Sequence, residues 1–152
     1  MKKFLSLLIL AGVLCIGVFA GGNYVSGVGL DATTLELLQR RSETWNMVCD
    51  SASKEAMFVE ELHKYVYGTL YSEDLSWFQE LRVNPTEMEP VEIIGFDAES
   101  IKKMGRSAEL VGVQSAIIRN ADGTAEMSKI REKVNLIEFQ GNWYLESLEV
   151  LD

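Results

Sequence analysis

The spacing of apolar residues changes about halfway along the chain. Before residue 84, apolar side chains recur every three or four positions, as they do on one face of a helix. Residues that cap or break helices divide this part into three stretches, at 34–50, 54–67 and 72–84. The first half of the chain therefore predicts three helices.

The first of these stretches has a recognisable start and two different faces. Thr33 and Glu36 have the spacing of a capping box, which places the start of the helix next to Thr33. Trp45 falls on the apolar face, whereas Arg40 and Arg41 fall off it. We therefore expect both arginines to face solvent, with Arg40 spaced for an ion pair with Glu36.

From Val91 onward, alternating apolar positions and many β-branched residues are typical of strands. Turn residues separate four segments, 91–104, 109–119, 125–140 and 143–151, and a two-residue hairpin is expected at Gly141-Asn142. Apolar residues of the third segment change face near Leu136, which predicts a β-bulge and a bent sheet. The whole pattern predicts an α+β fold, with three N-terminal helices packed on a curved four-stranded antiparallel meander.

The N-terminus has the pattern of an export signal. Lys2 and Lys3 precede an apolar run that ends in the small residue Ala20, so we expect cleavage before Gly21. The chain then consists of a signal peptide (1–20), a flexible Gly-rich leader (21–30) and a folded domain (31–152), and is exported to the periplasm or the extracellular space. A retained membrane anchor is the alternative, but the glycines after residue 20 leave the apolar run short for a spanning helix.

The charge of the chain excludes two classes of partner. The formal net charge is −9 at pH 7, and loss of the two signal lysines makes the mature chain more acidic. Phosphate backbones and anionic lipid surfaces repel such a protein, so we expect no nucleic-acid partner, and membrane association only through a retained N-terminal segment. A cationic or neutral partner fits this charge better.

Residues that could carry catalysis or bind a metal are few. Cys49 is the only cysteine outside the signal, so no internal disulfide is expected, and its place on an apolar helix face favours a buried, unreactive side chain. His63 is the only histidine, and it lies beside the inward-facing positions rather than on them. The following acidic residues lack the spacing of a calcium loop and are expected to form a solvated surface: Glu73, Asp74, Glu87, Glu89 and Glu92. The sequence predicts no metal site, no cofactor and no catalytic residue.

Three segments resemble a known family: 41–45 (Arg-Ser-Glu-Thr-Trp), 75–78 (Leu-Ser-Trp-Phe) and 134–145, which contains the last hairpin. They make residues 31–152 similar to the nuclear-transport-factor-two-like superfamily of cystatin-like α+β cones, in its exported bacterial form. The resemblance implies a cone-shaped domain with a hollow between helices and sheet, and a homodimer formed through the open face of the sheet. That superfamily contains dehydratases, isomerases and epoxide hydrolases as well as binding and assembly domains, so the fold alone does not choose a function.

Aromatic residues are expected where the helices meet such a cone, and a pocket there would have apolar walls and a largely apolar ligand. The candidate wall residues are Trp45, Phe58, Tyr65, Tyr67, Trp77 and Trp143. Because no set of acid, base and nucleophile is visible, we expect an exported, non-catalytic domain that binds a protein partner or a small apolar ligand. The alternatives are a small lyase or isomerase of the same fold and a membrane-anchored envelope assembly component.

Overall fold

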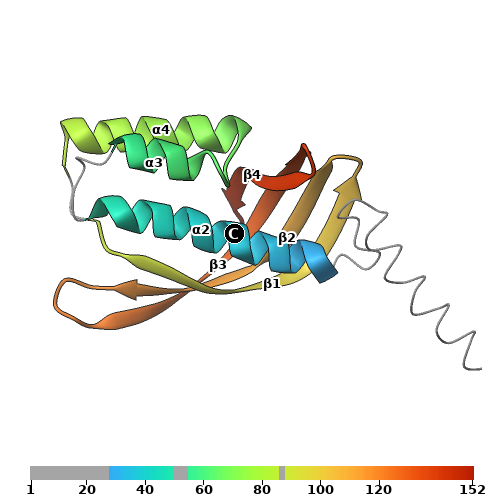
Figure 1. Ribbon diagram of the computed structural model, residues 1–152. Helices are drawn as coiled ribbons and strands as arrows, with labels where there is room; N and C mark the ends of the chain where they lie inside the picture. Colours follow the sequence, from blue (N-terminus) through green and yellow to red (C-terminus); the bar gives the residue numbers. More distant parts are fainter. Residues whose placement is uncertain (1–27, 50–54, 86–87) are drawn as a thin grey trace, which may run out of the picture.

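The computed structural model describes residues 28–49, 55–85 and 88–152. These residues form three helices followed by four strands, as Figure 1 shows. The helices are α2 (Val28–Cys49), α3 (Glu55–Leu62) and α4 (Gly68–Val83), and the strands are β1 (Val91–Met104), β2 (Ser107–Arg119), β3 (Ala125–Phe139) and β4 (Asn142–Val150). The predicted α+β class, with the helices before the sheet, is confirmed. The predicted signal peptide and residues 21–27 of the predicted leader lie outside the described residues.

The four strands form one antiparallel sheet in the order β1-β2-β3-β4. Each strand pairs with the next. The first and last hairpins are tight, because Met104 faces Ser107 and Phe139 faces Asn142, whereas residues 120–124 form a longer loop between β2 and β3. The pairing of β3 with β4 shifts by one residue between Asn135 and Leu136, so a bulge lies near Leu136 as predicted, but its placement in the third strand is wrong. The extra residue lies in β4 rather than in β3.

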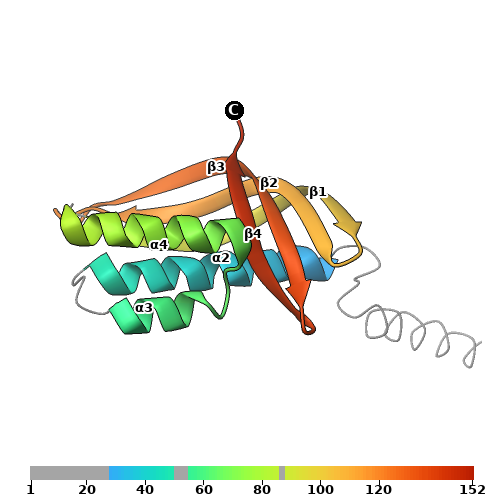
Figure 2. The same cartoon turned by 90° about the horizontal axis from the view of Figure 1, so that it is seen from above.

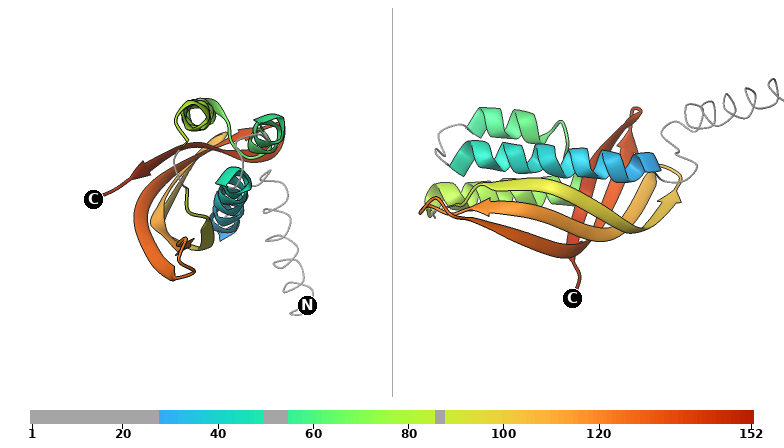
Figure 3. Two further views of the ribbon diagram at one scale, coloured as in Figure 1. Left: turned by 90° about the vertical axis from the view of Figure 1, so that its left-hand side faces the viewer. Right: turned by 90° about the horizontal axis from the view of Figure 1, so that it is seen from below.

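The sheet is curved, and α2 lies on its concave side. The end-on view in Figure 3 shows the strands curling around α2, and the view from above in Figure 2 shows α4 beside β4. Side chains of α2 bind the backbone of β1: Asn46 exchanges two hydrogen bonds with Val91, of 2.7 and 2.9 Å, and the Gln39 amide donates to the Ile93 carbonyl at 3.0 Å. These bonds fix α2 along the outer edge of β1.

The core fills the space between the helices and the sheet. Phe58 of α3 stacks on Phe78 of α4 with ring centroids 4.4 Å apart, and both rings are buried. Leu110, Leu136 and Leu145 close the core from the sheet side and are fully buried. Burial of these large apolar side chains supplies most of the driving force for this packing.

The first helix begins earlier than its capping-box pattern predicts. Thr33 lies inside α2, where its hydroxyl donates to the Gly29 carbonyl at 2.7 Å, so it is not a cap. Thr34 makes the equivalent bond to Leu30 at 2.7 Å, and Leu30 is buried in the core. The predicted leader is therefore wrong for residues 28–30, because burial of Leu30 extends the helix through them.

The second helix ends earlier than predicted, at Leu62. The next residues pair with β4 instead: the Tyr67 N–H donates to the Leu145 carbonyl at 2.8 Å, and the Leu145 N–H donates to Tyr65 at 2.9 Å. This short parallel bridge covers part of the outer edge of β4, and α4 then starts at Gly68.

The last hairpin turns one residue earlier than predicted. Its two central residues are Gln140 and Gly141, both with positive φ, of 52° and 81°. Two positive φ angles are the signature of a type I′ turn, whose twist matches that of the flanking strands.

Candidate functional site

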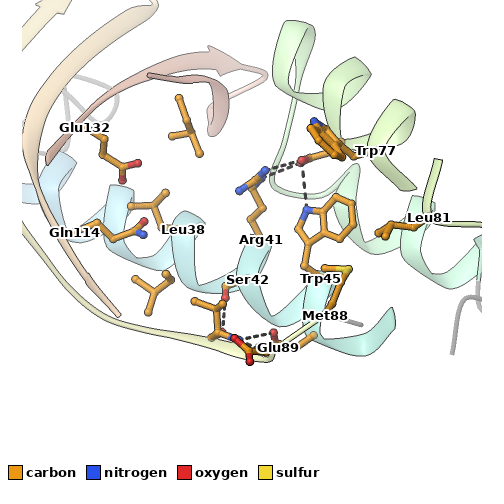
Figure 4. A pocket seen from close by; sticks show the side chains of 15 residues that line it. Leu38, Arg41, Ser42, Trp45, Trp77, Leu81, Met88, Glu89, Gln114 and Glu132 are labelled. Atoms are coloured by element: carbon orange, nitrogen blue, oxygen red, sulfur yellow. Dashed lines mark hydrogen bonds and ion pairs between the residues drawn. The ribbon is translucent and has the colours of Figure 1, made fainter. Parts of the chain in front are cut away.

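A cavity of about 570 Å³ lies between α2, α4 and the concave face of the sheet. Figure 4 shows it from close by. Its lining residues come from α2 (Leu38, Arg41, Ser42, Trp45, Asn46), α4 (Asp74, Trp77, Leu81), the segment before β1 (Met88, Glu89) and the four strands (Val91, Ile93, Gln114, Glu132, Leu148). The fold thus brings residues from both halves of the chain to one hollow.

Two of the six predicted wall residues line this cavity. Trp45 is partly buried and packs its edge on Phe58, with ring centroids 4.8 Å apart. Trp77 is 63% exposed, although it also lines the cavity, so its indole offers a large apolar surface to solvent.

The other four predicted wall residues do not line this cavity. Phe58 is fully buried between the helices, and Tyr65 packs against the core. Tyr67 is 40% exposed and stacks on Phe139, with centroids 6.0 Å apart, because the chain after Leu62 pairs with the edge of β4. Trp143 lies in the last hairpin, where the Lys103 ammonium sits 5.2 Å from its ring.

Three polar side chains connect α2 to α4 at the cavity. The Arg41 guanidinium donates from Nε to Asp74 Oδ2 at 2.8 Å and from Nη2 to Oδ1 at 2.5 Å. The Trp45 indole N–H donates to the same Oδ1 at 3.3 Å. Asp74 is 1% exposed, so this carboxylate is held by charge-assisted bonds in a buried place.

The predicted solvent exposure of Arg41 and Asp74 is therefore wrong. Arg41 reaches from the edge of the apolar face across to α4, because the buried Asp74 carboxylate requires a cationic partner. Arg40 remains at the surface, as predicted, but it pairs with Glu43 at 3.3 Å rather than with Glu36.

Glu132 is a site residue that sequence reasoning missed. It lies on β3 with only 5% of its surface exposed, and its Oε1 has no hydrogen-bond partner among the described residues. Burial raises the pKa of this carboxyl to about 7, and the positive charge of Arg41 opposes part of that rise. A signal was present, because Glu132 shares the alternation of Ile130, Val134 and Leu136, whose side chains face the helices.

The strand next to Glu132 carries a glycine opposite it, and the ring of Phe96 lies over that glycine. Gly112 of β2 faces Glu132 in register, and Gln114 follows on the same face of the sheet. A Cβ on Gly112 would lie 2.6 Å from the Asp97 carbonyl oxygen and 2.7 Å from Cζ of Phe96, so a larger residue does not fit. Figure 4 shows Glu132 and Gln114 on one side of the cavity and Trp77 and Leu81 on the other, with Arg41 and Trp45 between them.

The remaining candidates lie away from the cavity. His63 is exposed and its ring lies 5.0 Å from that of Tyr71. Glu92 pairs with Arg119 at 2.8 Å on the surface, while Glu87 and the side chain of Cys49 lie outside the described residues. In the described part of the chain, no group of three or more His, Cys, Asp or Glu residues is placed to hold a metal ion.

The fold is shared with a solved structure, although the sequence is not. No protein-family model and no curated protein matches the chain. The crystal structure of the intermembrane-space region of the chloroplast protein ARC6 superposes with a TM-score of 0.53 over 80% of this chain and 95% of that one, at 12% identity. At that identity the likeness shows a common fold and nothing about the ligand. Within the described residues, no helix combines the length and apolarity that crossing a membrane requires.

Proposed function

We propose that this protein is an exported binding domain that takes a small, largely apolar ligand into the cavity between α2, α4 and the sheet. The cavity itself supports the proposal: it has a volume of about 570 Å³, and aromatic and aliphatic side chains make up most of its wall. Sites for small organic molecules usually have this size, with mostly apolar walls and a few placed polar groups.

The aromatic wall of the cavity is backed by the core. Trp45 packs on Phe58, and Phe58 in turn stacks on Phe78, so the indole is supported by buried rings. The Trp45 N–H is anchored on Asp74. A ligand therefore meets a surface that is ordered before it binds, which lowers the entropy lost on binding.

Export is part of the proposal and rests on residues 1–20, with their two lysines, apolar run and small final residue. The shared fold of the ARC6 region, which lies in an intermembrane space, agrees with a domain that works outside the cytoplasm. We also propose that residues 31–152 form a cone of the nuclear-transport-factor-two-like superfamily, which their sequence resembles.

Binding can be tested with N-phenyl-1-naphthylamine, a neutral apolar dye whose fluorescence rises in an apolar site. Leu81→Trp on α4 adds bulk to the cavity wall, and Gln79→Trp adds the same side chain at an exposed position of α4 outside it. We expect saturable binding of the dye to the wild type and to Q79W. L81W should bind the dye at least about tenfold more weakly, because the added indole takes up space in the cavity and the loss of contact with a few CH₂ groups of the dye is enough for that change in affinity. Absence of saturable binding, or equal affinity in all three proteins, would contradict the proposal.

Acid–base catalysis is the second candidate, because a buried carboxyl with a pKa of about 7 can both give and take a proton near neutrality. We rank it second because the lining residues include no histidine or tyrosine, and Asp74 is held by Arg41. The test is exchange of the α-protons of 4-phenyl-2-butanone in D₂O, followed by NMR. A binding domain leaves the rate at its buffer value, whereas exchange that disappears in Glu132→Gln would establish catalysis.

A further inference from the structure

We propose that the ligand carries a cationic amine and that Glu132 binds this amine on the sheet side of the cavity. This inference rests on the proposed function and adds the chemical class of the ligand. It comes from one unpartnered carboxyl oxygen, from the charges around the cavity and from the position of the apolar wall.

Glu132 is buried without a partner for one of its oxygens. Only 5% of its surface is exposed, and among the described residues nothing donates a hydrogen bond to Oε1. A buried carboxylate of this kind is costly, and proteins normally pair it with a cation or several donors. A ligand that donates from a positive nitrogen would supply the missing partner.

The charges that line the cavity favour a cation. Arg41 is the only positively charged residue in the described lining, and two of its nitrogens bind Asp74. Asp74 offsets Arg41 in the net charge of the lining, which leaves two further acidic groups, Glu132 and the exposed Glu89 at the segment before β1. A ligand carboxylate would approach these charges, whereas an ammonium group would be attracted to them.

The position of the polar and apolar groups defines the shape of the ligand. Figure 4 places Glu132 and Gln114 on the side of the sheet and Trp77 and Leu81 on the side of α4. An amine at Glu132 therefore leaves the rest of the molecule against the aromatic wall formed with Trp45. A compact aromatic or aliphatic body that ends in an amine fits this arrangement, with the amine at Glu132 and the body against the rings.

Proton balance is consistent with this assignment. Burial raises the pKa of Glu132 to about 7, so part of the free protein holds this carboxyl as the neutral acid. An incoming ammonium ion favours the carboxylate, and the carboxyl proton is then released to the buffer while the ammonium keeps its own. Arg41 favours the same charged form of Glu132.

The test compares three molecules that share one apolar body: 2-phenylethylamine, 2-phenylethanol and phenylacetate, titrated by calorimetry at pH 7.5. We expect the amine to bind at least about tenfold more tightly than the alcohol, as for a charge-assisted hydrogen bond in a buried site, and phenylacetate to bind most weakly. Equal affinities for amine and alcohol, or tightest binding of phenylacetate, would overturn the inference.

Variants then locate the amine. Glu132→Gln keeps the size of the side chain and removes its charge, and Glu126→Gln makes the same change at an exposed position of β3. E132Q should lose the preference for the amine and keep its affinity for the alcohol, while E126Q should behave as the wild type. An amine preference that survives in E132Q would overturn the inference, and if E132Q does not fold, the wild-type series decides alone.

The two proposals fail in different ways. If the dye N-phenyl-1-naphthylamine binds in the cavity but the amine is not preferred, the binding domain stands and the amine is wrong. The same holds if the dye binds and none of the three phenyl compounds does. If neither the dye nor any phenyl compound binds, the binding function itself is wrong.

Discussion

Arg41 of α2 and Asp74 of α4 lie 33 positions apart in the sequence and form a two-pronged ion pair, with N–O distances of 2.8 and 2.5 Å. Asp74 is 1% exposed, and its Oδ1 accepts hydrogen bonds from both Arg41 Nη2 and the Trp45 N–H. The pair therefore joins the two helices that form the outer wall of the cavity, and it does so beside Trp45.

Removal of Asp74 should be costly, because it leaves the partly buried Arg41 guanidinium without its carboxylate partner. We expect Asp74→Ala to lower the free energy of unfolding by about 3 kcal/mol. Glu92→Ala is the control, since it removes an exposed ion pair with Arg119 and should change the same quantity by less than about 1 kcal/mol. Urea denaturation followed by tryptophan fluorescence measures both values. If the two variants lost similar amounts of unfolding free energy, the Arg41–Asp74 pair would not stabilise the fold more than a surface ion pair does.

The titration of Glu132 should make stability depend on pH in a definite direction. Its pKa in the folded protein is about 7, against 4.5 in the unfolded chain, so between these values the folded state holds more protons than the unfolded state. The free energy of unfolding should then fall as pH rises from 5 to 7.

Glu132→Gln does not titrate, so this contribution disappears in the variant. The difference in unfolding free energy between E132Q and the wild type should therefore rise between pH 5 and pH 8 by up to about 3 kcal/mol. This value is the free energy that corresponds to the difference between the pKa of Glu132 in the folded and in the unfolded protein. Urea denaturation at four pH values gives the two curves. If the unfolding free energies of the two proteins changed with pH in the same way, the pKa of Glu132 would not be raised by burial.

Gly112 should be intolerant of even a methyl group. A Cβ there would lie 2.6 Å from a backbone oxygen of β1 and 2.7 Å from the ring of Phe96, which is buried. We expect Gly112→Ala to cost about 1–3 kcal/mol of unfolding free energy, as overpacked sites do. Gly95→Ala is the matched control, because its Cβ would meet Ser115 at an ordinary 3.9 Å, and thermal denaturation of the two variants should separate them clearly.

The exported form should begin at Gly21. The small residue Ala20 closes the apolar run, and cleavage after it removes both lysines of the signal. Intact-mass spectrometry of the protein purified from its natural host measures this directly. A mass that includes residues 1–20 would favour the membrane-anchored alternative.

The order of the helices and strands could be predicted from the sequence, but the polar part of the site could not. The periods of 3.6 and 2 predicted the helices and the meander, because local patterns of burial determine both, whereas the strand that carries the bulge near Leu136 was predicted wrongly. The start of α2 could not be read this way, since the burial of Leu30 depends on tertiary packing that overrides the capping signal at Thr33. Tyr67 and Trp143 lie outside the cavity for the same reason. The bridge to β4 determines the position of Tyr67, and the position of the last hairpin determines that of Trp143, and both are tertiary features.

The pairing of Arg41 with Asp74 required knowledge of how two helices cross, which no local pattern supplies. Glu132 differs, because its place among alternating apolar residues of β3 was visible in the sequence. A charged residue at an inward position of a predicted strand is a simple signal for a functional or unusually paired group. That signal, rather than the aromatic residues alone, points to the cavity.

The most direct test of the cavity as a binding site is an NMR titration of methyl-labelled protein with 2-phenylethanol. We expect chemical-shift changes at Leu38, Leu81 and Leu148, which line the cavity, and none at the exposed Val150. Changes confined to the surface around Tyr67 and Phe139, or no saturable change at the three leucines, would contradict the account.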